Sequence, residues 1–131
     1  MTPKTVARKV ARLALTKKAH DVQIMDLRKL TDIADFFVIG TADSDVQVKA
    51  VADAVADGME HLGVPLWHRE GISQRQWVLL DYVDVVVHIF HRETRAFYSL
   101  DKLWGDAAVE IIEDDAPKKK PARRKTPAKT V

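Results

Sequence analysis

Hydrophobic residues follow a helical period in two segments of the chain. In residues 5–19, Val6, Val10 and Leu13 share one helical face, and Pro3 suits the first turn of a helix. Further along, a second apolar stripe is formed by Val48, Val51, Val55, Met59 and Leu62. We therefore predict two amphipathic helices that pack their apolar faces against the rest of the domain.

The second helix also has clear end signals. Ser44 followed by Gln47 fits a capping box, in which a hydroxyl and a side-chain amide bind the free N–H groups of a helix start. Gly63 and then Pro65 follow the stripe, as is typical of a helix carboxyl end. The sequence thus predicts a helix from residue 44 to residue 62.

Alternating or continuous apolar runs predict strands elsewhere. Two runs, 22–27 and 34–40, lie between the helices, and the second is apolar enough for a central strand. Further strands are predicted near 65–70, 75–81 and 84–91, with short helices near 94–112. This order favours an α/β fold, an α+β sandwich with a mixed sheet of about five strands flanked by helices.

Charge is distributed unevenly along the 131 residues. Residues 1–18 contain six basic side chains and residues 116–131 contain seven, and neither segment has an acidic one. Residues 19–115 therefore hold 8 of the 21 basic residues and all 19 acidic ones, a net charge of −11. An acidic module of this kind suits a basic protein partner better than bare nucleic acid.

The length fits a single domain, which we place at residues 1–115. Residues 116–131 lack an apolar period, and we expect a disordered basic tail. Such a tail either keeps the domain soluble or binds a phosphate-rich surface. The basic stretch 5–19 also fits an organelle transit peptide, but a surface helix with a basic outer face is favoured.

The absence of cysteine excludes disulfides, thiolate metal sites and cysteine nucleophiles. No apolar run approaches the roughly 18 residues that a membrane span requires. No secretory signal is visible either. We therefore expect a soluble cytoplasmic protein, with no membrane partner and no cofactor.

Residues 40–45 are the first candidate for chemistry. They join an apolar strand to a helix start, where backbone N–H groups could hold a phosphate, and Asp43 and Asp45 have a D-x-D spacing used in metal-held nucleotide chemistry. Both carboxylates would repel an anion, however, and both suit the start of a helix. Helix capping is favoured, and a minimal Mg²⁺-dependent nucleotidyltransferase is kept as an alternative function.

Five histidines raise the question of a metal or acid–base site. His88 and His91 are three residues apart on a predicted strand, so they point to opposite faces. His68 stands near Glu70 without a nucleophile in view. We expect neither a metal site nor a catalytic residue, and we expect His88 to be a half-buried, hydrogen-bonded sheet residue.

Residues 77–104 carry the strongest functional signal. Val78 and Leu80 form an aliphatic face of a strand, whereas Trp77, Leu79 and Asp81 form a mixed face that is typical of a protein interface. The helical segment that follows is rich in residue types that dominate binding hot spots, with Arg95, Tyr98, Leu100 and Trp104. We expect Trp77, Tyr98 and Trp104 to contact a partner together.

This block resembles the signature of the ribosomal silencing factor (Iojap) family, which reads roughly W-x-L-x-D, V-V-H and R-x-(F/L)-Y-x-L-(E/D)-x-L-W. The resemblance extends over about residues 5–110, through the segments 31–39, 44–53, 70–71, 77–81 and 85–104. It implies a fold similar to that of nucleotidyltransferases but without their catalytic acids. It also implies that the chain is no enzyme.

The resemblance further implies a translational repressor. Family members bind ribosomal protein number fourteen on the large ribosomal subunit, block joining of the small subunit when nutrients are short, and form homodimers when free. Matched by motif, the interface residues are Glu70, Trp77, Asp81, Arg95, Tyr98, Leu100 and Trp104. The basic tail lies outside the pattern and would add a weak contact to ribosomal RNA. An RNA-binding ribosome assembly factor is the other alternative.

Two positions depart from the family pattern. The usual S-x-R-Q has Val46 in place of arginine, so a basic contact is lost. The usual D-Y-G-D turn has Val83 in place of glycine, which removes the residue that best permits a positive φ.

Overall fold

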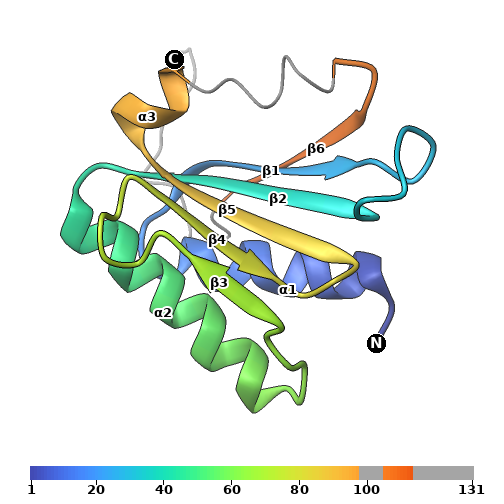
Figure 1. The fold of residues 1–131 in the computed structure, drawn as a ribbon, viewed down its shortest axis with the longest axis horizontal. Coiled ribbons are helices and arrows are strands. Elements are labelled where there is room, and N and C mark those ends of the chain that lie inside the picture. The colour runs from blue at the N-terminus through green and yellow to red at the C-terminus, as the bar shows by residue number, and fades with distance from the viewer. Residues whose placement is uncertain (98–104, 114–131) are drawn as a thin grey trace, which may run out of the picture.

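The computed structural model describes residues 1–97 and 105–113. In chain order its elements are α1 (Pro3–Leu15), β1 (His20–Asp26), β2 (Phe36–Ala42), α2 (Asp45–His61), β3 (His68–Glu70), β4 (Trp77–Asp81), β5 (Val85–His91), α3 (Arg92–Phe97) and β6 (Ala108–Ile112). The strands form one sheet in the order β3-β4-β5-β2-β1-β6 (Figure 1). The central pair, β2 and β5, is parallel, and the other neighbours are antiparallel. The predicted mixed α+β sheet is confirmed.

Helices α1 and α2 cover the same face of the sheet (Figure 1). The predicted stripe of α2 is buried at Val48, Val51, Val55 and Met59, whereas Leu62 at the end of the helix is 42% exposed. Helix α1 buries Val6, Val10 and four further small or aliphatic residues and leaves its basic residues outside. Each buried aliphatic side chain stabilises the fold by about 1.5–3 kcal/mol. This face buries the larger number of them, so it holds the main core.

The start of α2 is capped as the sequence predicts, with one difference. The Ser44 hydroxyl accepts a hydrogen bond from the Gln47 backbone N–H at 3.1 Å. The Gln47 amide oxygen accepts from the N–H of Asp43 at 2.7 Å, one residue before the cap. Its nitrogen donates to the carbonyl oxygens of Lys17 and Lys18, at 3.1 and 3.0 Å. The cap therefore also joins α2 to the end of α1.

The prediction of helices throughout residues 94–112 is wrong for the last part of that range. Residues 108–112 form β6, which pairs antiparallel with β1 and makes a sixth strand where about five were expected. Three of its five residues are Val109, Ile111 and Ile112, and β-branched side chains favour strands over helices. None of the helices in residues 1–97 and 105–113 is long and apolar enough to cross a bilayer.

The turn between β4 and β5 keeps a left-handed residue although its expected glycine is absent. Val83 has a φ of 75°, which a β-branched residue adopts only under strain. Its N–H donates to the Asp81 carboxylate at 2.7 Å, and the Tyr82 N–H donates to the Val85 carbonyl at 2.8 Å. These bonds hold the turn in place.

Replacing Val83 by Gly is therefore expected to raise the free energy of unfolding by about 1 kcal/mol, because it removes the Cβ that opposes this backbone geometry. The lost side chain is 58% exposed, so little burial is forfeited. Urea denaturation measures the change. Arg75→Gly is the comparison, since Arg75 has a φ of 58° but is unbranched and donates to the Ile72 carbonyl. If Arg75→Gly raises the free energy of unfolding as much as Val83→Gly does, the β-branched side chain of Val83 is not the source of the strain.

The other face of the sheet carries a second, smaller core. It consists of Met25, Leu27, Ala34, Phe37, Ile39, Val86 and Phe90, with Trp77, Leu79 and Ala107 packed at its edge. Helix α3 lies on this side of the sheet, opposite α1 and α2 (Figure 1). This second face presents Trp77 and Asp81, two of the residues expected to bind a partner.

Candidate functional site

The two faces of β4 differ as the sequence predicts. Val78 and Leu80 are fully buried against the helices, whereas Trp77, Leu79 and Asp81 are half-buried on the opposite face. A half-buried indole beside an aliphatic side chain is a composition typical of protein interfaces. The face is therefore a candidate docking surface.

A hollow of about 420 Å³ lies beside this strand. It is lined by Glu70, Gly71, Gln74, Gln76, Trp77, Leu79 and Thr94. Trp77 and Leu79 give it an apolar lining, and Glu70, Gln74 and Gln76 add a carboxylate and two amides. The Glu70 carboxylate is exposed and lies 2.8 Å from His68 Nε2. These features suit a protein side chain with an apolar stem and a polar end.

Trp77 is held in place by two aromatic neighbours. Its indole Nε1–H donates to His88 Nδ1 at 3.0 Å, and its ring stacks on Phe90 with centroids 4.9 Å apart. His88 is only 4% exposed, so the expectation of a half-buried histidine is wrong in degree, although the hydrogen bond is confirmed. Burial lowers the pKa of His88 from 6.5 to about 4 and keeps the ring neutral.

Gly71 brings the end of β3 against the start of β4. Its φ is 86°, and an added Cβ would lie 2.0 Å from the Trp77 carbonyl oxygen. Only glycine fits this approach of two backbones. The Glu70-Gly71 pair therefore shapes the hollow as well as contributing a charge to it.

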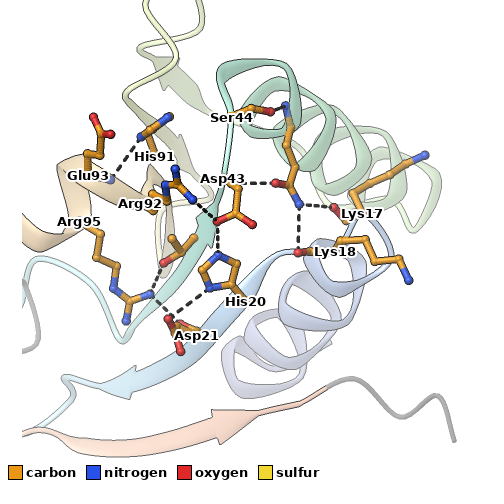
Figure 2. Close-up of polar contacts among 12 residues, drawn as sticks. Lys17, Lys18, His20, Asp21, Asp43, Ser44, His91, Arg92, Glu93 and Arg95 are labelled. Atoms are coloured by element: carbon orange, nitrogen blue, oxygen red, sulfur yellow. Dashed lines mark hydrogen bonds and ion pairs between the residues drawn. The ribbon is translucent and has the colours of Figure 1, made fainter. Parts of the chain in front are cut away.

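Asp81 and Arg95, both expected at the interface, make internal contacts. The Asp81 carboxylate accepts from the Val83 N–H in the β4–β5 turn. One guanidinium nitrogen of Arg95 donates to the Asp21 carbonyl and to the Thr41 hydroxyl, each at 2.7 Å (Figure 2). Thr41 is buried at 3% exposure, so Arg95 anchors α3 to the ends of β1 and β2.

Replacing Arg95 by Ala is expected to lower the free energy of unfolding by about 1–3 kcal/mol, because charge-assisted hydrogen bonds are lost and the Thr41 hydroxyl loses its donor. The matched control is Arg92→Ala in the same helix. The Arg92 side chain is 60% exposed and lies 4.0 Å from the Asp43 carboxylate, so its loss should cost less than about 0.5 kcal/mol. Equal costs in urea denaturation would show that Arg95 is no anchor.

The remaining expected interface residues, Tyr98, Leu100 and Trp104, lie outside the described residues. Their place relative to Trp77 stays a prediction. Seven residues in all were expected at the interface. Of the four that the structure describes, Glu70 and Trp77 meet at the hollow, whereas Asp81 and Arg95 lie at opposite ends of the sheet.

Asp43 does not cap α2 with its carboxylate, so that part of the prediction is wrong. The carboxylate accepts from His20 Nε2 at 2.8 Å and faces Arg92, while His20 Nδ1 lies 3.2 Å from Asp21 (Figure 2). Asp45 accepts from the N–H of Val46 at 3.1 Å. The contacts of Asp43 with His20 and Arg92 and the local bond of Asp45 account for both acids. In residues 1–97 and 105–113 no three His, Asp or Glu side chains are grouped to hold a metal ion.

A family model described as ribosomal silencing factor during starvation matches residues 1–131. The chain belongs to the ribosomal silencing factor family. The family's description is of a regulatory role at the ribosome, which supports translational repression rather than catalysis.

Individual relatives agree with this membership. The ribosomal silencing factor RsfS of Bacillus subtilis is 38% identical over 113 residues, covering 86% of this chain and 96% of the relative. That of Halalkalibacterium halodurans is 42% identical over 97 residues, covering 74% and 83%. A crystal structure of a Chromobacterium violaceum protein has a TM-score of 0.79 at 30% identity, covering 88% of this chain and 97% of that one.

Proposed function

We propose that this chain represses translation by binding ribosomal protein number fourteen of the large ribosomal subunit through the Trp77 face. The bound protein then occupies the space that the small subunit needs. The observation that carries the proposal is the half-buried, hydrogen-bonded Trp77 beside a hollow on the sheet face opposite α1 and α2, in a member of this family.

Charge and geometry both support a protein partner with basic character. Residues 19–115 have a net charge of −11, and Glu70 is exposed at the rim of the hollow. Opposite charge on the partner speeds encounter and excludes wrong partners. Repression by occupancy needs no chemistry, so the proposal requires no catalytic role of Asp43 or Asp45.

Residues 116–131 are proposed to act as a tail that adds a weak, salt-sensitive contact to ribosomal RNA, through seven basic side chains. The folded domain is then residues 1–115. We also propose that the free protein is a cytoplasmic homodimer. These proposals rest on charge and on the family resemblance.

The test is subunit joining in a sucrose gradient. Purified large subunits are incubated with excess protein, small subunits are added, and the fraction of joined ribosomes is measured. We expect the joined fraction to fall as the protein is titrated. Normal joining at saturating protein, with the protein bound to large subunits, would rule out steric repression.

A further inference from the structure

His88 is an unusual residue for its position. It lies on β5, one of the two central parallel strands, and is 4% exposed. Its Nδ1 accepts the Trp77 bond, whereas its Nε2 is buried without a hydrogen-bond partner among the described residues. A buried polar atom without a partner is unfavourable. An aliphatic residue would fill this part of the second core without that penalty.

The ring of His88 is fixed by its neighbours. Phe37 packs edge to face against it with centroids 4.5 Å apart, and Phe90 lies nearly parallel to it. Because Trp77 donates to Nδ1, that nitrogen carries no hydrogen, and the neutral ring carries its hydrogen on Nε2. The acceptor therefore points at the indole in a defined direction.

We propose that His88 is the positioning residue of the docking surface, holding the Trp77 indole in the orientation that the partner meets. This inference rests on the proposed function of the Trp77 face. A half-buried indole has rotamers to choose from, and fixing one in advance removes an ordering cost from binding. The cost of burying an unpaired Nε2 is then explained by the hydrogen bond that Nδ1 accepts from Trp77.

The test compares two substitutions at one position. His88→Leu is apolar and removes the acceptor, whereas His88→Asn keeps an oxygen close to the place of Nδ1. We expect His88→Leu to weaken binding to purified large ribosomal subunits by about tenfold and His88→Asn by about threefold or less, on the scale of one hydrogen bond. We expect His88→Leu to leave the urea midpoint unchanged or higher, so that affinity and stability move apart.

Tyr82→Phe is the matched control. The Tyr82 hydroxyl is also buried without a partner among the described residues, but Tyr82 belongs to the core under α1 and α2. Its replacement should leave subunit binding unchanged. If Tyr82→Phe weakens subunit binding as much as His88→Leu does, the effect follows from removing any buried unpaired polar group. That result would overturn the inference.

Nuclear magnetic resonance tests the same idea without a variant. The ¹⁵N shifts of His88 should show an unprotonated Nδ1 and a protonated Nε2, and the Trp77 indole N–H should exchange slowly with water. The opposite tautomer would overturn the inference whether or not His88→Leu folds. If Trp77→Ala weakens binding and His88→Leu does not, the inference alone fails. If Trp77→Ala binds normally, the proposed docking face fails with it.

Discussion

Replacing Trp77 by Ala is expected to weaken binding to large ribosomal subunits by about 3 kcal/mol, roughly a hundredfold, which is the scale of a central hot spot. The indole combines a large apolar surface with a fixed orientation, since it stacks on Phe90 and donates to His88. Truncation removes both. The measurement is the equilibrium affinity for purified subunits at a fixed salt concentration.

The chain supplies a matched control for this prediction. Trp67 lies on the loop before β3, is 71% exposed, and has its ring tilted against that of His68, with centroids 5.8 Å apart. Trp67→Ala removes the same side chain from outside the hollow, and its affinity should stay within about threefold of the original. If Trp67→Ala and Trp77→Ala lose the same affinity, the partner does not bind specifically at the Trp77 hollow.

Trp77→Ala also removes a ring from the second core, so its free energy of unfolding is expected to fall by about 1–3 kcal/mol. Binding must therefore be measured where the variant is fully folded, as shown by circular dichroism. Loss of affinity in a folded variant then reports on the surface and not on the fold.

The sequence predicted the helices because each carries its own evidence. In α2 the apolar period, the Ser44 cap and Gly63 all act within one segment, and the structure has the helix at Asp45–His61. The two faces of β4 were equally predictable, since alternation alone places Val78 and Leu80 in the core. Local patterns of this kind do not depend on distant residues.

Edge strand β6 could not be predicted in the same way. Its pairing with β1 joins residues about ninety positions apart, and of its five residues Ile112 alone is buried, so the strand shows no alternation. Val109 and Ile111 are 45% and 56% exposed, so they follow no core pattern. Their β-branching is the one local signal for a strand in this segment.

The candidate site also divides into residues that local patterns predict and contacts that depend on distant residues. Trp77 was identified from residue type and Glu70 from the family resemblance, and the structure places both at one hollow. The bond of Arg95 to Thr41 was missed, because it joins helix α3 to a strand more than fifty residues earlier. The apolar residues around His88 were the signal for its full burial, but its pairing with Trp77 depends on the register of β4 and β5.

Acidification is expected to destabilise the fold by about 3 kcal/mol between pH 6.5 and pH 4 through His88 alone. Burial lowers the folded-state pKa of His88 to about 4, below its ordinary value of 6.5. Above pH 6.5 the residue is neutral in both states and has no effect. As the pH falls below 6.5, the unfolded chain binds a proton that the folded chain excludes, so the free energy of unfolding decreases until the folded chain is protonated near pH 4.

Urea denaturation at a series of pH values measures this loss, and His88→Asn should remove most of it, because the asparagine does not titrate. His61→Gln is the control, since His61 is exposed at the end of α2 and should leave the pH dependence in place. Asp26 acts in a lower window: its bond to Arg28 lowers the pKa of its carboxyl from 3.8 to about 2, so its contribution is lost only as the pH falls through that range. A curve for His88→Asn that still falls steeply between pH 6.5 and 4 would show that other groups set the acid sensitivity. Protonation of Nδ1 in the folded chain also breaks the bond to Trp77, so the indole on which partner binding is proposed to depend should be released only near pH 4, at the lower end of this range.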